Sequence, residues 1–369
     1  MKIAIIGSRG YPYVYGGFET LVKELSERLI KHDVEVHVYC QKNLFKSFPP
    51  VVNGVHLHYI PTLKGKSLNQ IVHSFFSIIH ATFSSVDVIF VVNLAAGPMG
   101  WIPKITGKKT MINVDGLEWL RPKWKGMGSR YFHFAAKMAV KLFDQIITDA
   151  EAMRKVYLEE FNTDSTVIAY GAPPFKPAEA SSLARFNLNK EEYYLIVGRL
   201  IPDNNADLII KGFLSSTSTK KLVVVGDVPY ADTYAESLKK LQNDNLIFLG
   251  YITDQQELAA LYQNSFAYIH GHKYGGTNPA MLKAMSNNCA ILALDTVFNR
   301  EMLSNGEFGL FFGESEKFVA DCLALLENHP DQVKTLRTKV SSGLTDKYNW
   351  DKVTNAYYQA MKELVKPSK

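Results

Sequence analysis

The chain has 369 residues, of which 47% are hydrophobic and 21% charged, and its formal net charge is +5. This is about twice the length of a common domain of roughly 100–200 residues, so we expect two domains. The composition is that of a globular protein and excludes disordered, fibrous and disulfide-framed proteins, since the chain has only three widely spaced cysteines.

The basic residues are concentrated in the first half of the chain. Residues 1–172 carry 20 Lys and Arg against 14 Asp and Glu, whereas the rest carries 21 against 22. Residues 121–143 hold six Lys or Arg and no acid. So local an excess argues against nucleic-acid binding. With an odd cysteine count, no secretory signal and no apolar run of about 20 residues, we expect a cytoplasmic protein.

In the first half, short β-branched runs alternate with amphipathic stretches. This alternation is typical of βα units, which form a doubly wound parallel sheet. The expected strands are residues 2–7, 34–40, 55–60, 86–92, 110–114, 145–148 and 166–168, and the expected helices are 19–31, 68–83, 129–143 and 151–161. Three prolines within residues 173–177 cannot continue a strand or helix, so we place the domain boundary there.

The same alternation returns after the boundary. The expected strands are residues 194–197, 221–225, 246–249, 267–270 and 290–294, and the helices are 207–214, 233–241, 255–262, 278–285, two segments after Glu316 and Asp331, and 351–365. We therefore predict an α/β protein with two Rossmann-like doubly wound domains, residues 1–172 and 173–349. Residues 350–369 are expected to form a helix that packs back on the first domain.

The first loop at a strand's carboxyl end, residues 7–19, contains Gly16 and Gly17 directly before a helix. It lacks both the Gly-x-Gly-x-x-Gly fingerprint and the Gly-Lys-Ser/Thr of a Walker loop, which argues against a nicotinamide dehydrogenase. The two glycines can still offer backbone N–H groups to a diphosphate. The alternative is a plain glycine turn.

Asp115, Glu118 and Trp119 follow the strand expected at residues 110–114. Carboxylates accept hydroxyl donors and an indole covers the apolar face of a pyranose, so this group suits a sugar. The alternative is that Asp115 caps the next turn.

In the second half, Arg199 follows a strand and can fork onto phosphate oxygens. The small residues Gly275, Gly276, Thr277 and Asn278 let backbone amides approach an anion. His270 and His272 have no third ligand at metal-binding spacing, so we expect no metal.

These motifs occur in one order along nearly the whole chain: Gly16 to Glu19, Asp115 to Trp119, Gly198-Arg199 with Pro202 to Asn205, His270 to Pro279, and Phe298 to Glu301. In that order they resemble the rhamnosyltransferase-like branch of family-4 retaining glycosyltransferases, which have the GT-B fold. The resemblance implies a nucleotide-diphospho-sugar donor, dTDP-, UDP- or GDP-linked, bound by the second domain, an acceptor on the first, and chemistry in the cleft between them. It implies no separate cofactor and no protein nucleophile. It also implies that the leaving diphosphate takes the acceptor proton on the same face.

By this resemblance Asp115, Glu118 and Arg199 are catalytic. The donor-binding residues are Gly16, Gly17, Arg199, Asn204, Asn205, Gly275, Gly276, Thr277, Asn278, Lys283 and Glu301. Two departures stand out. Gly275 and Lys283 occupy the positions of a common Glu-x7-Glu element, and Asn204 and Asn205 replace a common lysine. Lys283 can only donate hydrogen bonds, whereas a carboxylate there accepts them from the nucleotide ribose.

A basic and aromatic surface is expected from Trp119, Trp124, Arg130, Lys137 and Lys141. It suits an acceptor or an anionic bilayer, and similar transferases extend polyprenyl-linked glycans. The alternative is an ordinary helix with a solvated basic face. We therefore expect an enzyme, peripheral on the inner face of the cell membrane, that transfers a hexose or deoxyhexose such as L-rhamnose to a lipid-linked glycan of a bacterial surface polysaccharide. The alternatives are a nucleotide-sugar 2-epimerase of the same fold and a non-catalytic nucleotide-sugar-binding protein.

Overall fold

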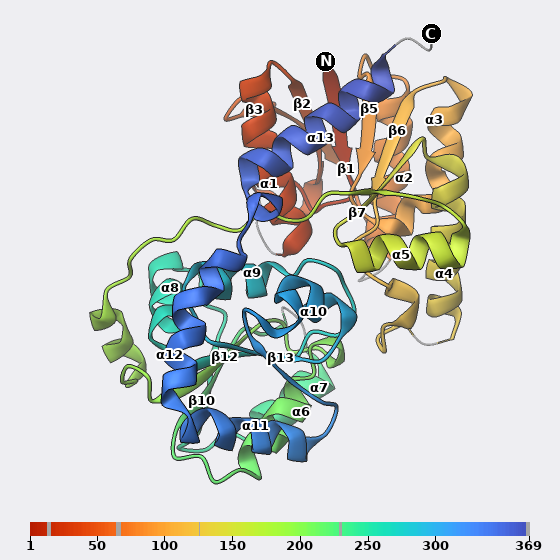
Figure 1. Ribbon diagram of the computed structural model, residues 1–369. Coiled ribbons are helices and arrows are strands. Elements are labelled where there is room, and N and C mark those ends of the chain that lie inside the picture. Colours follow the sequence, from red (N-terminus) through yellow and green to blue (C-terminus); the bar gives the residue numbers. More distant parts are fainter. Residues whose placement is uncertain (13–15, 64–67, 125, 229–230, 367–369) are drawn as a thin grey trace. The chain divides into compact units, whose positions relative to one another are not determined.

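The computed structural model describes residues 1–12, 16–63, 68–124, 126–228 and 231–366 (Figure 1). The chain forms two compact units. The first comprises Met1–Gly171 and Lys347–Lys369, and the second comprises Ala172–Asp346. Each unit is built on one sheet, which confirms the predicted α/β class with two parallel-sheet domains.

The first unit has an eight-stranded sheet in the order β3-β4-β2-β1-β5-β6-β7-β8. Its strands are β1 (Lys2–Ile6), β2 (Glu35–Gln41), β3 (Val51–Val52), β4 (Val55–Ile60), β5 (Val88–Val91), β6 (Lys109–Asn113), β7 (Gln145–Thr148) and β8 (Thr166–Val167). All pairings are parallel except that of β3 with β4. This antiparallel strand was not predicted, since two residues are too few to show a period.

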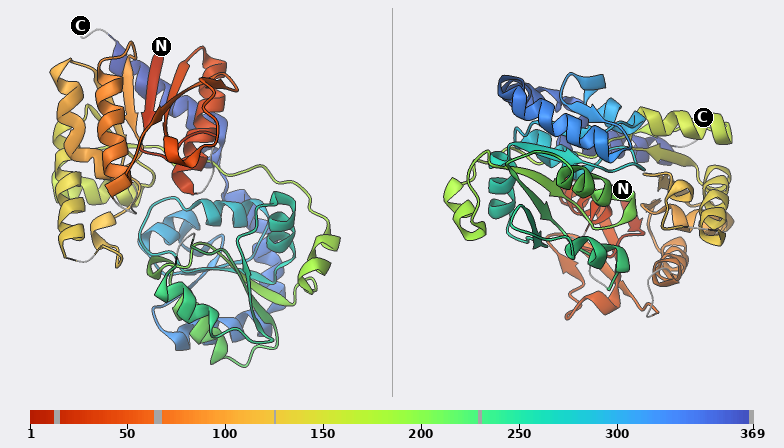
Figure 2. Two further views of the ribbon diagram at one scale, coloured as in Figure 1. Left: turned by 180° about the vertical axis from the view of Figure 1, so that it is seen from behind. Right: turned by 90° about the horizontal axis from the view of Figure 1, so that it is seen from below.

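Helices cover both faces of this sheet. They are α1 (Gly17–Leu29), α2 (Leu68–Thr82), α3 (Trp101–Ile105), α4 (Met127–Leu142), α5 (Glu151–Phe161) and α13 (Trp350–Val365), with the short 3-10 helices η3 (Leu94–Gly100) and η4 (Glu118–Leu120). In the left view of Figure 2, α2 lies in front of the sheet and α13 behind it.

The C-terminal helix α13 packs against α1, β5 and β6 of the first unit. Its Tyr357 ring lies 5.3 Å from the ring of Phe90 on β5. A Cβ at Gly171 would lie 2.3 Å from the indole of Trp350, the first residue of α13. Only glycine permits so close an approach, so Gly171 fixes where α13 meets the end of the segment Met1–Gly171.

The second unit has a six-stranded, fully parallel sheet in the order β11-β10-β9-β12-β13-β14. Its strands are β9 (Tyr193–Val197), β10 (Lys221–Val225), β11 (Leu246–Gly250), β12 (Ala267–His270), β13 (Ile291–Leu294) and β14 (Leu310–Phe312). Its helices are α6 (Ala206–Leu214), α7 (Thr233–Lys239), α8 (Gln255–Asn264), α9 (Pro279–Ser286), α10 (Val297–Met302), α11 (Glu316–Asn328) and α12 (Pro330–Lys339). Side chains of Asp232, Asp254 and Asn278 cap the helices that they precede.

Histidines gather where α2 covers β2 and β4 of the first unit. His37 Nδ1 lies 2.9 Å from His58 Nε2, and Tyr39 Oη lies 2.8 Å from His80 Nδ1. Burial, reinforced by the neighbouring histidines, lowers the pKa of His58 to about 4. Burial also lowers the pKa of His73, which is fully enclosed, to about 4.

We expect this cluster to make the first unit acid-sensitive. The folded pKa values lie below the ordinary histidine value of about 6.5, so the fold favours the neutral rings and loses stability as the pH falls from about 6.5 toward 4. For His73 the loss is about 3 kcal/mol. Urea unfolding at pH 7, 6, 5 and 4.5 should show a falling midpoint, with a shallower fall in His73→Gln. A midpoint equal at pH 7 and pH 4.5 would contradict this account.

Candidate functional site

In the second unit, two loops at the carboxyl edge of the sheet are joined by hydrogen bonds. Asn204, in the loop after β9, has its Oδ1 2.7 Å from Nδ1 of His272, in the loop after β12. The side-chain N–H of Asn205 donates to the Gly271 carbonyl at 2.7 Å. A Cβ at Gly271 would lie 2.3 Å from the Asn204 carbonyl oxygen, so glycine is required there. The structure thus joins the predicted Asn204 and Asn205 to the 271–278 loop.

Arg199 stands at the start of the first of these loops, two residues after β9 ends. Its side chain is exposed, and its guanidinium has no ion-pair or hydrogen-bond partner in the part of the chain that the structure describes. A guanidinium presents a planar fork of donors that fits two phosphate oxygens. At this sheet edge, where open α/β sheets bind ligands, Arg199 is available for a diphosphate.

The Gly275 to Asn278 segment leads into α9. The Asn278 side chain caps this helix by accepting from the Ala280 N–H at 2.9 Å. The backbone N–H of Asn278 donates to the sulfur of Met302 at 3.3 Å. This corrects our expectation for Asn278, whose N–H already has a partner inside the unit and does not point freely at an anion. The backbone amides of Gly275 and Gly276 remain candidates for diphosphate binding.

Lys283 lies in the second turn of α9 and Glu301 on α10. Lys283 is partly buried, and this burial lowers the pKa of its ammonium. The ammonium forms no ion pair with a described residue, Glu301 included. A cation held in this way is ready to pair with an anionic ligand.

At the start of α1 in the first unit, the predicted anion site already holds a carboxylate. Glu19 is buried in the first turn, and its Oε1 accepts from the Arg9 backbone N–H at 3.1 Å and from the Arg9 guanidinium at 3.3 Å. Its Oε2 would lie 3.3 Å from a Cβ placed on Gly16. Gly16 and Gly17 therefore lie beside a carboxylate that is already paired with Arg9, and their donor-binding role stays a prediction.

Asp115 follows β6 and belongs to a buried polar group. The hydroxyl of Tyr170 donates to its Oδ2. Burial, followed by the nearby charge of Asp149, raises the pKa of Asp115 well above its ordinary value. Asp149 and Tyr170 were not predicted as site residues. Both follow strands of the same sheet, β7 and β8, so their place at the carboxyl edge was the available signal.

Glu118 is held by its own neighbours and differs from the sugar-binding carboxylate that we expected. Its Oε1 pairs with Arg121 at 2.9 Å, and its Oε2 pairs with Lys123 at 3.3 Å and accepts from the Trp124 indole N–H at 2.7 Å. Burial opposes its ionisation, but these partners outweigh burial and lower the pKa of Glu118. Both oxygens are thereby used to fix the turn before α4.

Trp119 is 7% exposed, which corrects the expectation of a surface indole. Its ring packs edge-on against Tyr157 and Phe161 of α5, because the turn held by Glu118 directs it inward. Trp119 also lines an open pocket of about 440 Å³ on the first unit, called here the η4–α4 pocket. The residues that line this pocket are Trp119, Leu120, Ser129, Arg130, His133, Phe134 and Lys137. Trp124 is partly buried, and Lys141 lies exposed further along α4.

Two negative findings concern the described residues. No group of three or more His, Cys, Asp or Glu among them could hold a metal ion. No helix in the described ranges has the length and apolar character needed to cross a bilayer.

Comparisons with protein families and solved structures show which known proteins this chain resembles. Residues 181–340 match the family described as glycosyl transferases group 1, and residues 1–52 and 70–173 match a domain of unknown function, DUF1972. No curated protein sequence matches the chain.

Solved structures match almost the whole chain at low identity. They include sucrose-phosphate synthase from Thermosynechococcus elongatus, with 16% identity, 98% of each chain covered and a TM-score of 0.83. The Anabaena protein Alr3699/HepE in complex with UDP-glucose has 13% identity, 98% and 100% coverage and a TM-score of 0.78. An α,α-trehalose-phosphate synthase (UDP-forming) from Burkholderia vietnamiensis has 11% identity, 98% and 100% coverage and a TM-score of 0.74.

The chain therefore has the GT-B fold, and residues 181–340 of its second unit match the model of the glycosyl transferases group 1 family. Together these findings indicate a glycosyltransferase. The DUF1972 match covers most of the first unit outside α13.

Proposed function

We propose that this protein is a retaining glycosyltransferase of the rhamnosyltransferase-like branch of family 4. It transfers a hexose or deoxyhexose, with L-rhamnose as the first candidate, from a nucleotide-diphospho-sugar to a lipid-linked glycan. The product belongs to a bacterial surface polysaccharide. In this proposal the enzyme needs no separate cofactor and works at the inner face of the cell membrane.

The observation that carries this proposal is the hydrogen-bonded pair of loops in the second unit, with the Arg199 guanidinium beside them and unpaired among the described residues. Such an arrangement offers a fixed cation and small-residue backbone to a diphosphate, which is the group common to nucleotide-sugar donors. Structures of the similar Anabaena protein hold UDP, UDP with glucose, and UDP-glucose, which supports a donor of this kind.

In the proposed reaction the leaving diphosphate removes the proton of the acceptor hydroxyl on the face where the new bond forms. The protein then acts mainly by positioning the reactants and stabilising the growing charge on the diphosphate. Arg199 supplies that charge stabilisation from the second unit. Asp115 of the first unit orients the acceptor hydroxyl, with Tyr170 holding its carboxyl in place.

The experiment that tests the function has two stages. A thermal-shift screen across dTDP-, UDP- and GDP-sugars should identify a donor, since a ligand at 100 times its Kd adds about 2.7 kcal/mol of stability. Transfer from that donor to a lipid-linked glycan is then followed by NMR of the anomeric proton. Retention of the donor's anomeric configuration is expected, and inversion would contradict the retaining mechanism.

Lys283 favours one second candidate, a non-catalytic nucleotide-sugar-binding protein, because a lysine stands where relatives carry a ribose-binding carboxylate. We expect instead that the ammonium contributes to donor binding, since it is partly buried and has no acidic partner among the described residues. Lys283→Glu should then weaken donor affinity about tenfold or more, the cost of replacing one cation beside a phosphate with an anion.

The control for this prediction is Lys334→Glu, which makes the same charge change at an exposed position of α12. It should leave donor affinity within twofold of the parent. Calorimetry measures both affinities, and a donor-turnover assay accompanies it. A Lys283→Glu protein that binds donor more tightly and gains turnover would show that the lysine marks a lapsed active site.

Contact with the membrane is also part of the proposal. Arg130, Lys137 and Lys141 are exposed along α4, as a cationic face requires. Basic residues near an anionic leaflet each contribute about 1 kcal/mol of attraction. A peripheral position of this kind would bring the first unit to a lipid-linked acceptor.

A further inference from the structure

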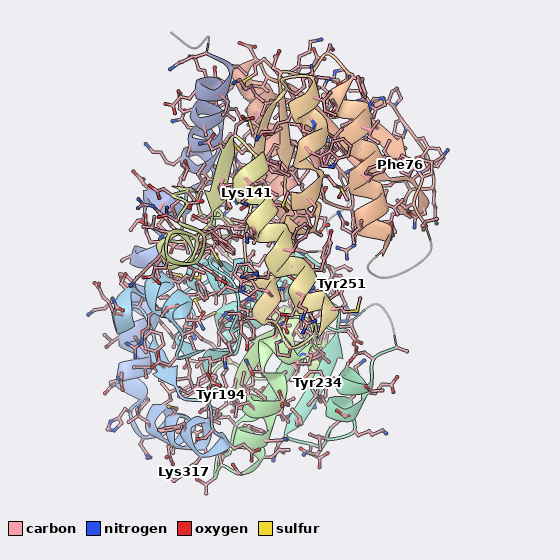
Figure 3. The ribbon with its side chains drawn as sticks, turned by 90° about the vertical axis from the view of Figure 1, so that its right-hand side faces the viewer. Phe76, Lys141, Tyr194, Tyr234, Tyr251 and Lys317 are labelled. Carbon is pink, nitrogen blue, oxygen red and sulfur yellow. The ribbon has the colours of Figure 1, made fainter. Side chains whose placement is uncertain are left out.

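One face of the first unit contains no acidic helix residue. The helices α2, α3 and α4 include not one Asp or Glu in their sequences. The η3–α3 segment packs against both α2 and α4, so the three helices form a continuous face, on which Figure 3 labels Phe76 and Lys141. We call it the α2–α4 face. Its uniform charge distinguishes it from the mixed faces of α5 and α11.

Large apolar side chains project from this face into solvent. Phe83, directly after α2, is 75% exposed, and Trp101 and Ile105 of α3 are 52% and 71% exposed. Lys104 lies between the last two in the sequence, and its ammonium donates to the Lys141 carbonyl at 3.0 Å. Apolar and aromatic side chains interspersed with lysines, without acids, are the composition of interfacial surfaces on anionic bilayers.

The η4–α4 pocket lies on the side of α4 that neighbours α5, where His133 contacts Glu160, and it combines three features. Trp119 gives it an aromatic floor, Arg130 and Lys137 supply two cations two turns apart on one helix, and the half-exposed Leu120 and Phe134 form an apolar rim. The carboxylate of Glu160 reaches its edge, where it is bonded to His133 at 2.8 Å. Two cations over an aromatic floor with an apolar rim suit a phosphate carried on a hydrocarbon chain.

We propose that the η4–α4 pocket binds the headgroup phosphate of an anionic phospholipid. Arg130 and Lys137 contact the phosphate, Leu120 and Phe134 contact the start of an acyl chain, and Trp101 and Ile105 enter the bilayer interface. The occupant is a phospholipid and not a soluble anion, because the apolar rim and the exposed α3 side chains would gain nothing from free phosphate. This inference rests on the proposed function, in that it names the lipid partner of the surface placed at the membrane.

The test compares two double variants that each remove two positive charges from the first unit. Arg130→Gln/Lys137→Gln alters the pocket, whereas Lys104→Gln/Lys155→Gln alters exposed cations that do not line it. Dihexanoyl phosphatidylglycerol, kept below its micelle concentration, is titrated into each full-length protein by calorimetry. We expect one site per chain, weakened about 30-fold by the pocket variant at about 1 kcal/mol per cation, and within threefold of the parent in the other. Dihexanoyl phosphatidylcholine and inorganic phosphate should bind at least tenfold more weakly.

Three outcomes would overturn the proposal. Equal loss in both double variants would assign the attraction to diffuse charge and not to the pocket. Inorganic phosphate binding as tightly as the phosphatidylglycerol would make the pocket a soluble-anion site. Self-association that Trp101→Ser abolishes would assign the face to a second copy of the chain. Nucleotide-sugar binding is measured in the same preparations, so loss of the lipid site with the donor site intact separates this inference from the proposed function.

Discussion

Replacing Arg199 with alanine is expected to reduce the transfer rate about 10²- to 10³-fold while the protein stays folded. The guanidinium is exposed and unpaired among the described residues, so its removal breaks no described side-chain contact of the unit. In the proposed reaction it neutralises the diphosphate more strongly as the glycosidic bond breaks, and removing one such interaction costs about this much in kcat.

The matched control is Arg185→Ala, which removes an exposed arginine of the same unit that pairs with Glu257 instead of standing free. It should leave turnover within twofold of the parent. Steady-state kinetics with the donor found by the thermal-shift screen gives kcat and KM for both variants, and circular dichroism checks folding. Turnover of Arg199→Ala within threefold of the parent would show that this residue does not stabilise the leaving group.

The second large effect is expected at Asp115, where asparagine should lower kcat/KM for transfer about 10²-fold or more. Asparagine keeps the shape of the side chain but cannot carry the charge or exchange the proton of the carboxyl. Donor affinity should be nearly unchanged, because the proposed diphosphate contacts all lie in the second unit. Asp164→Asn serves as the control, since this exposed aspartate precedes β8 at the opposite edge of the same sheet.

The pH dependence of kcat/KM gives a second test of the role of Asp115. Burial and then the charge of Asp149 raise the pKa of Asp115, so Asp149→Asn should move the acid limb of kcat/KM to lower pH. An acid limb that does not move would mean that Asp115 does not titrate in the reaction. A fall in donor affinity equal to the fall in kcat/KM would instead place Asp115 in the donor site.

The order of strands and helices was predictable because each element shows its own period. β-branched runs and amphipathic stretches predict most of the elements, including α4 and α9. Short elements were missed for a physical reason. The 3-10 helix η3 and the helix α3 follow β5 within one apolar stretch, where a buried helix and a buried strand have the same composition.

The candidate site was predictable to the extent that it depends on strand ends. Arg199, Asn204 and Asn205 could be found because ligands bind at the carboxyl edges of parallel strands. His272 has no donor-binding role of its own in the sequence-based prediction, and its bond to Asn204 joins two residues that are 68 positions apart. Such long-range pairing leaves no local pattern in the sequence.

At Glu118 and Trp119 the sequence suggested a sugar-binding role that the structure does not support. An acid and an indole beside a strand end indicated a sugar site, but Arg121, Lys123 and Trp124 lie close enough along the chain to use the Glu118 carboxylate themselves. The turn that they fix then buries the indole. Residue types were read correctly in this segment, but which neighbours would pair with one another depended on the turn geometry.

The central claim is that the loops after β9 and β12 hold the nucleotide-diphospho-sugar. Hydrogen–deuterium exchange of the wild-type protein, with and without the donor at 100 times its Kd, tests this claim most directly. We expect slower exchange in residues 198–205 and 271–283 of the second unit, because backbone amides that contact the diphosphate and loops that it orders open less often. Protection confined to the first unit, or unchanged exchange in both loops while donor is bound, would contradict the account.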